Sequence, residues 1–213
     1  MVYLGCPSKS LLRGFEVFRL IMNLVPLNKL VRSLGADVCT LPAVTGLGTI
    51  ILDKSEVLVL ISEDIRCFFY LFGVPREWHK CLAFGREVPP SLLPCHCTEP
   101  HYLCSLVLPM GFVSSVSIAQ HIHRRIARLS LHGITPGVGP QTEMRRDKPA
   151  SSSPWLHRIY LDNFDALEKV DCRLASLIKG EPSVEALAMR DGYQSTVGLA
   201  AAPEEVGGTG ALG

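Results

Sequence analysis

Two aspartates stand where a protein can collect divalent cations. Asp64 follows the apolar run Val57–Ile61, and Asp162 lies in an acidic tip between an apolar stretch that starts at Trp155 and another that starts at Phe164. Hard cations such as Mg²⁺ take oxygen ligands, which the chain must bring together from distant positions. Two such ions can activate a hydroxyl and neutralise a phosphate in nucleotidyl transfer. Asp64 and Asp162 are therefore candidate metal ligands.

The elements that must position these aspartates follow from the local sequence. The stretch around Asp162 predicts a short β-hairpin with Asp162 and Asn163 at its turn, because Asp bonds its own backbone and Asn tolerates positive φ. The run Val57–Ile61 predicts a buried strand with Asp64 at its C-terminal end. Asn163 is expected to be a turn former and only a weak ligand, since an amide oxygen lacks the charge that attracts Mg²⁺.

A helix is predicted from Ser114 to just before Gly133, because its apolar residues recur at spacings of three or four. These residues are Val116, Ala119, Ile122, Ile126 and Leu129. The basic side chains of the same stretch fall on the other side and are expected to face solvent: His121, Arg124, Arg125 and Arg128. A second helix is predicted from Ala166 to Lys179.

Four segments carry recognisable motifs in a fixed order: Arg19–Asn28, Asp64–Phe69, Leu108–Ser115 running on to Gln120, and Tyr160–Asn163. The second is an Asp with an aromatic five residues later, the third reads Leu-Pro-x-Gly-x-x-x-Ser, and the fourth is Tyr-x-Asp-Asn. Together they resemble the motifs of reverse transcriptases of retrotransposons, over roughly residues 12–175. The resemblance implies an α+β fold of fingers and palm, with a small antiparallel sheet packed on helices and no recognisable thumb.

The resemblance also implies roles for single residues. Asp64 and Asp162 would bind two Mg²⁺ ions, for which Mn²⁺ can substitute, and Asn163 would replace a further catalytic carboxylate. Phe69 would exclude the ribose 2′ hydroxyl by its shape, and Gly111 would let the backbone approach the nascent base pair. The implied nucleotide contacts are Arg19, Ile65, Phe69, Pro109, Met110, Gly111 and Gln120.

The same resemblance implies how the chain is divided. Fingers-like segments are expected at 1–60 and 76–107, and palm-like segments at 61–75 and 108–180. A Gly-, Pro- and Ser-rich flexible insert is expected at 133–153 within the palm. Residues 181–213 are expected to form a weakly ordered tail.

The implied function is reverse transcription, in which dNTPs are added to a primer 3′ end on an RNA or DNA template. The chain would act as part of a retroelement polyprotein and would need its other domains. Asn163, Asn23 and Val25 depart from the family's motifs. They favour an alternative, an inactive and degenerate retroelement fragment that keeps the fold and at most binds nucleic acid weakly.

Composition sets wider bounds. The chain has 213 residues, of which 47% are apolar and 19% charged, so it can form a substantial core. Its apolar runs are too short to span a bilayer and its start does not resemble a signal peptide, so a cytoplasmic or nuclear protein without a membrane partner is expected. A second alternative is a small zinc module at Cys95–Cys104, although its Cys-x-Cys spacing is tighter than that of common zinc sites.

Overall fold

The computed structural model describes residues 2–197 with gaps at 5–7, 13–14, 18–19, 36, 94–98, 135–138, 176–177 and 179–182. Internal contacts divide the chain into two units. The first unit is made of Met1–Leu34 and Phe69–Ser115, and the second of Gly35–Phe68 and Val116–Gly213. Each unit therefore combines two separate stretches of the chain.

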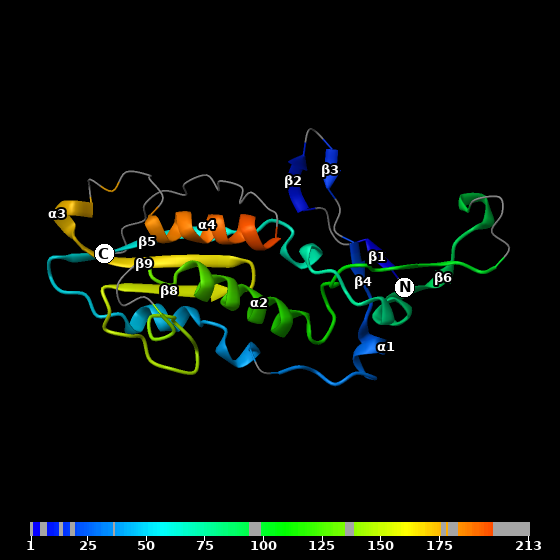
Figure 1. The fold of residues 1–213 in the computed structure, drawn as a ribbon, viewed down its shortest axis with the longest axis horizontal. Coiled ribbons are helices and arrows are strands. Elements are labelled where there is room, and N and C mark those ends of the chain that lie inside the picture. Colours follow the sequence, from blue (N-terminus) through cyan, green and yellow to red (C-terminus); the bar gives the residue numbers. More distant parts are fainter. Residues whose placement is uncertain are drawn as a thin grey trace. The chain divides into compact units, whose positions relative to one another are not determined.

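The second unit is built on a three-stranded antiparallel sheet with the strand order β5-β9-β8 (Figure 1). Its strands are β5 (Glu56–Asp64), β8 (Trp155–Tyr160) and β9 (Asn163–Asp171). β9 pairs with β5 along its whole length, from Asp64 opposite Asn163 to Glu56 opposite Asp171. The mixed α+β architecture with small antiparallel sheets confirms the coarse fold class predicted from the sequence.

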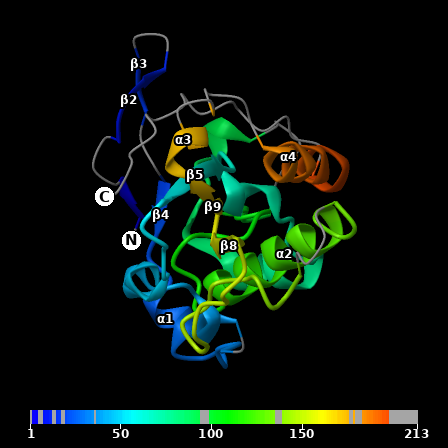
Figure 2. The ribbon, with the colours of Figure 1, turned by 90° about the vertical axis from the view of Figure 1, so that its left-hand side faces the viewer.

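Helices cover one side of this sheet. Figure 2 shows α2 (Ser115–Ser130) and α4 (Val184–Val197) on the same side, and α2 confirms the helix predicted from Ser114. On the other side lies η2 (Val44–Thr49), whose Leu47 packs with Met144, Leu156 and Leu167. The remaining short helices of this unit are η1 (Val38–Thr40) and α3 (Cys172–Ala175).

Two stretches differ from the sequence-based expectation. The helix predicted from Ala166 to Lys179 is wrong, because β9 continues to Asp171 and only Cys172–Ala175 are helical. Pairing with β5 and β8 on both edges outweighs the helix-forming composition of this segment. Residues 184–197, expected in a weakly ordered tail, form α4, which buries Ala186, Met189 and Tyr193.

The segment expected to be a flexible insert carries contacts with the sheet. Glu143 forms a parallel bridge with His157, and Met144 N donates to His157 O at 2.7 Å. Thr142, Glu143 and Met144 are all buried. This part of the insert therefore lies as an extra edge beside β8.

Arg124 on α2 explains why Glu143 is buried. Arg124 was expected to face solvent, but it is 6% exposed. Its Nε donates to Glu143 Oε1 at 2.5 Å and its Nη2 to Glu143 Oε2 at 3.0 Å, while Nη1 donates to Asp37 Oδ1 at 2.5 Å. Burial opposes the charge of Arg124, yet these two carboxylates raise its pKa above the ordinary value. The prediction was wrong because the spacing of apolar residues in a helix does not show whether a charged side chain has a buried partner.

The first unit contains three small strand pairs. β1 (Val2–Leu4) pairs with β4 (Leu20–Met22), β2 (Ser8–Leu12) with β3 (Phe15–Val17), and β6 (Ala83–Glu87) with β7 (Tyr102–Cys104). Its helices are α1 (Val25–Asn28), η4 (Arg76–Leu82) and η5 (Pro90–Leu92), and η3 (Phe68–Leu71) begins at the unit boundary. Asn28 donates to Gly111 O at 2.8 Å and accepts from Val113 N at 2.9 Å. It thereby connects the first and third sequence motifs within this unit.

The unit boundaries only partly follow the predicted domains. Both divisions interleave two segments of the chain, but residues 35–60, expected with the fingers, belong to the sheet unit. Residues 69–75 and 108–115, expected with the palm, belong to the first unit. Two kinds of contact account for the first difference: β5 pairs with β9 from Glu56 onward, and Leu47 and Ile50 pack on the core cluster beside the sheet. None of the described helices is both long and apolar enough to cross a membrane.

Candidate functional site

The hairpin predicted around Asp162 is present, with a different turn. β8 and β9 are joined by Leu161 and Asp162 alone, and Tyr160 lies opposite Asn163. Asn163 is therefore the first residue of β9 and not part of the turn. The positive φ that was expected near Asn163 falls on Leu161, at +54°. A leucine rarely adopts this region and does so only where its surroundings hold it there.

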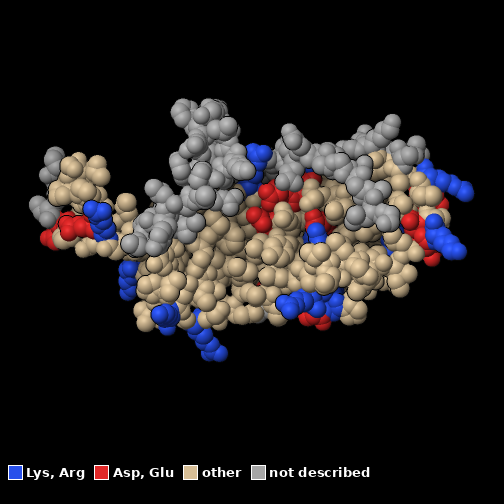
Figure 3. Space-filling view, turned by 180° about the vertical axis from the view of Figure 1, so that it is seen from behind, with Lys and Arg blue, Asp and Glu red and all other residues tan. Residues whose placement is uncertain are grey.

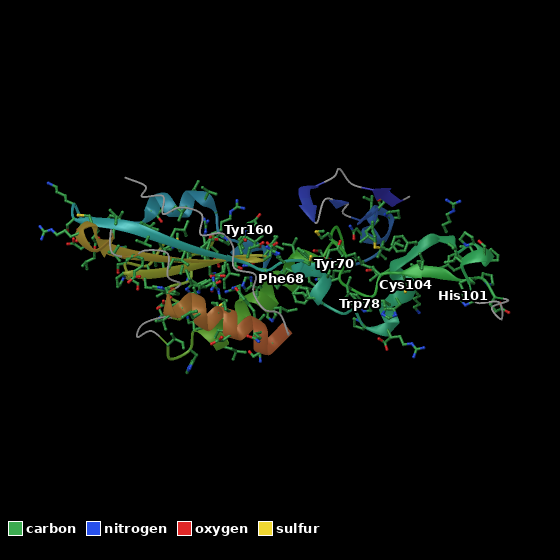
Figure 4. The ribbon with its side chains drawn as sticks, turned by 90° about the horizontal axis from the view of Figure 1, so that it is seen from above. Phe68, Tyr70, Trp78, His101, Cys104 and Tyr160 are labelled. Atoms are coloured by element: carbon green, nitrogen blue, oxygen red, sulfur yellow. The ribbon has the colours of Figure 1, made fainter. Side chains whose placement is uncertain are left out.

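Asp64, Asp162 and Asn163 lie together at one end of the sheet. Asp64 is the cross-strand partner of Asn163, and Ile65 N donates to Asp162 O at 3.0 Å. The four residues, including Ile65, thus form one corner although about a hundred residues separate the two halves. Figure 4 shows Tyr160 and Phe68 at the same end of the sheet.

Two side chains of α2 hold the hairpin turn. Gln120 Nε2 donates to Ile159 O at 2.8 Å, and Gln120 Oε1 accepts from Leu161 N at 2.9 Å. His123 Nδ1 lies 2.5 Å from Leu161 O. Gln120 is fully buried, and both ends of its amide are bonded to the backbone of the hairpin.

His123 continues this contact to α4. Its Nε2 lies 2.7 Å from the hydroxyl of Tyr193. A carbonyl can only accept, so Nδ1 carries the proton toward Leu161 O and the Tyr193 hydroxyl donates to Nε2. Phe68 packs on the His123 ring at a centroid distance of 5.4 Å.

Burial favours the uncharged forms of His123 and Tyr193. Complete burial lowers the pKa of His123 to about 4, although its bond to Leu161 O acts in the opposite direction. Burial, together with the negative charges of Glu63 and Asp64, raises the pKa of Tyr193. A neutral imidazole and a protonated phenol are the states that their hydrogen bond requires.

β5 contributes an unexpected buried charge beside Asp64. The run Val57–Ile61 was predicted to be buried, but its side chains are half-buried and Leu60 is 45% exposed. Glu63 is instead 2% exposed and accepts from Arg190 of α4 at 2.5 Å. Within the described part of the chain, Glu63 Oε2 and Arg190 Nε have no hydrogen-bond partner. The alternation of β5 brings Glu63 to the face that α4 covers and Asp64 to the other face.

Most of the other predicted site residues belong to the first unit: Phe69, Pro109, Met110 and Gly111. Gly111 has a φ of +93°, which suits glycine, and its carbonyl accepts from Asn28. Arg19 lies outside the described residues.

The sequence prediction missed four residues that support the site: His123, Tyr193, Glu63 and Arg190. A signal existed for α4, since Ala186, Met189 and Tyr193 recur at helical spacing. Their neighbours are a glycine and several polar residues, which hides this stripe. Polar residues on the buried face of α2 leave no comparable signal, because periodicity marks apolar side chains only.

Only part of the segment predicted as an alternative zinc module lies within the described residues. Cys95, His96 and Cys97 lie outside the described residues, whereas His101 is exposed and Cys104 half-buried. Figure 4 shows these last two at separate places along their segment. In the described part of the chain, no three His, Cys, Asp or Glu side chains form a group that can hold a metal ion.

The donor set at the corner of the sheet fits a hard divalent cation. Asp64 and Asp162 each offer a carboxylate and Asn163 an amide oxygen, and nothing in the set is a soft ligand. Two carboxylates supply two negative charges, one fewer than a site with aspartate at 163. By its chemistry alone, such a set would take a hard cation such as Mg²⁺, with a weak third ligand.

Two buried histidines predict a loss of stability in acid. Burial lowers the pKa of His123 to about 4 and that of His157 to about 3; for His157, the positive charges of Lys148, Arg124 and Arg128 act in the same direction. The unfolded chain binds these protons near pH 6.5, so stability is fully present above that pH. It should fall below pH 6.5 by about 1.4 kcal/mol per pH unit for each histidine. Urea unfolding at pH 7, 6 and 5 measures the slope.

A His157→Gln variant provides the control for this pH dependence. It cannot be protonated, so the slope of the unfolding free energy between pH 6 and 5 should drop by about half. An unchanged slope would show that groups other than His157 cause the acid sensitivity.

The described surface carries its charges in small groups. On the face drawn in Figure 3, most of the described surface bears neither Lys or Arg nor Asp or Glu. An extended basic surface is therefore not a feature of that face.

Comparison with known proteins adds no relative: no protein-family model matches the chain, and no curated protein matches it.

Proposed function

We propose that this chain is the fingers and palm part of a retroelement reverse transcriptase, which adds dNTPs to a primer 3′ end on an RNA or DNA template. One observation carries the proposal. Asp64 lies opposite Asn163, with Asp162 in the adjoining turn, so two motifs that are far apart in sequence meet at one corner. This backbone pairing supports a cation site held by carboxylates, which nucleotidyl transfer needs.

The chain's own residues divide the work of such a site. Asp64 and Asp162 would hold Mg²⁺, and bound Mg²⁺ supplies activation of the primer hydroxyl and neutralisation of the triphosphate. Gln120 and Ile65 fix the hairpin backbone on either side of Asp162. Catalysis of this kind depends mainly on positioning and on charge stabilisation. The nucleotide contacts implied by the resemblance are part of the proposal: Arg19, Ile65, Phe69, Pro109, Met110, Gly111 and Gln120.

The alternative is an inactive relative that keeps the fold. Its support is also specific: Asn163, which faces Asp64 across the sheet, has no negative charge. The loss of one carboxylate weakens the attraction for a divalent cation. Such a chain would at most bind nucleic acid weakly.

Primer extension decides between the two. The purified chain is incubated with a labelled DNA primer on an RNA template, dNTPs, and either Mg²⁺ or Mn²⁺. The proposal expects extension that a chelator abolishes and that Asn163→Asp increases. If neither form extends the primer, although both fold and bind the primer–template, the chain is the inactive relative.

A further inference from the structure

We propose that His123 and Tyr193 are positioning residues for the hairpin turn, so that α4 takes part in the candidate site. The role concerns the orientation of Asp162 and rests on the proposed function. Neither side chain has a place in the sequence motifs. Both are among the most deeply buried side chains in the described part of the chain, at 0% and 1% exposure.

The turn is fixed from outside the hairpin. Leu161 N donates to Gln120 and Leu161 O accepts from His123, so both peptide groups of Leu161 are bonded to α2. The next carbonyl, that of Asp162, accepts from Ile65 N. These three backbone groups flank the Asp162 side chain, and each of them is bonded to a residue outside the hairpin.

The two-residue turn requires an unfavourable conformation of Leu161, and the bonds from α2 help to offset its cost. The Leu161 φ of +54° is unfavourable for a leucine, by roughly 1–2 kcal/mol. Without the bonds from α2, the turn would relax toward a commoner conformation and the Asp162 side chain would point in a different direction. The bond from His123 therefore helps to set where a cation held by Asp162 lies.

Tyr193 holds the second ring nitrogen of His123. Leu161 O can only accept, which places the proton on Nδ1, and the Tyr193 hydroxyl then donates to Nε2 and stabilises this tautomer. Burial supports this state by keeping the imidazole neutral. α4 thus acts on the turn through one ring, at a point about seventy residues from His123 in the sequence.

Two substitutions separate the two bonds of His123. In His123→Asn the amide nitrogen reaches the place of Nδ1, so the bond to Leu161 O is kept and that to Tyr193 is lost. In His123→Gln the amide reaches the place of Nε2, so the bond to Tyr193 is kept and that to Leu161 O is lost. Each variant loses one neutral hydrogen bond, so their unfolding free energies should be similar.

The positioning role predicts that the two variants differ in function while they match in stability. The kcat of single-nucleotide incorporation should be about tenfold or more lower for His123→Gln than for His123→Asn, since small misplacements cost that much. The KM for the dNTP should be the same in both. Equal kcat values in two equally stable variants would overturn the proposal.

Hydrogen exchange tests the turn without any activity. Peptides that cover residues 159–165 should exchange fastest in His123→Gln. In His123→Asn, which keeps the bond to Leu161 O but lacks the bond to Tyr193, they should exchange at a rate between those of His123→Gln and wild type. Tyr193→Phe should also speed exchange there, whereas Tyr102→Phe, on the exposed strand β7, should not. Equal exchange rates of these peptides in the two His123 variants would contradict the positioning role. If the exchange rates are as expected but the wild type extends no primer, the proposed function is wrong, whereas the positioning of the turn by His123 and Tyr193 is supported.

Discussion

Replacement of Asp162 by asparagine is expected to lower the rate of primer extension by about a thousandfold. A carboxylate that holds a catalytic cation contributes several kcal/mol of charge stabilisation, and each 1.4 kcal/mol is a factor of ten. Asn keeps the size of Asp and is accepted in tight turns, so the hairpin should persist. Only the charge toward the cation changes. The measurement is kcat/KM for a single dNTP with Mg²⁺.

Asp53→Asn is the matched control for this change. Asp53 is exposed and precedes β5, so its replacement should leave the incorporation rate as it is. Both variants should unfold at the temperature of the wild type to within a few degrees. If Asp162→Asn, correctly folded, keeps a rate within about tenfold of the wild type, Asp162 is not a catalytic ligand.

The largest effect on stability is expected from Arg124→Met. Arg124 is buried between Glu143 and Asp37, whose side chains are 4% and 14% exposed. Removal of the cation leaves two carboxylates largely cut off from water, and the loss of one partner of a buried pair costs about 3–5 kcal/mol. Urea unfolding at pH 7 should show a decrease of that size in the unfolding free energy.

Two further variants test whether the loss of stability comes from the buried ion pairs of Arg124. Arg125→Met changes the neighbouring, exposed arginine and should alter the unfolding free energy by less than about 0.5 kcal/mol. In the double variant Arg124→Met with Glu143→Gln, the unfolding free energy should decrease by less than the sum of the two single decreases. The second change removes one carboxylate that Arg124→Met leaves without its cation. Similar stabilities of Arg124→Met and Arg125→Met would contradict the role of Arg124 as a buried ion-pair partner.

The parts of the site that the sequence predicted are those with local signals. The β-branched run before Asp64, the hairpin around Asp162 and the helix from Ser114 each have a pattern that spans only a few residues. The pairing of Asp64 with Asn163 follows from these elements once they share a sheet. Family resemblance supplied the suggestion that they do.

The remainder depends on partners that lie far away in the sequence. Periodicity makes Arg124 a solvent-facing residue, but the fold brings Glu143 and Asp37 next to it. The bonds between the Gln120 amide and the hairpin likewise join residues about forty positions apart. Ala166–Val170 has a helix-forming composition, yet two neighbouring strands make it the centre of a sheet. Leu161 at positive φ has no signature in its own residue type, because the two-residue hairpin turn requires this conformation at its first position.

The long separation between β5 and β9 has a consequence during synthesis on the ribosome. β5 emerges about a hundred residues before β9, its one strand partner among the described residues. At about 5–20 residues per second, the apolar run Val57–Ile61 would wait about 5–20 seconds with an unpaired strand edge. That interval is long enough for aggregation or for capture by a chaperone. Efficient production of this chain should therefore depend on the folding assistance available in the host cell during translation.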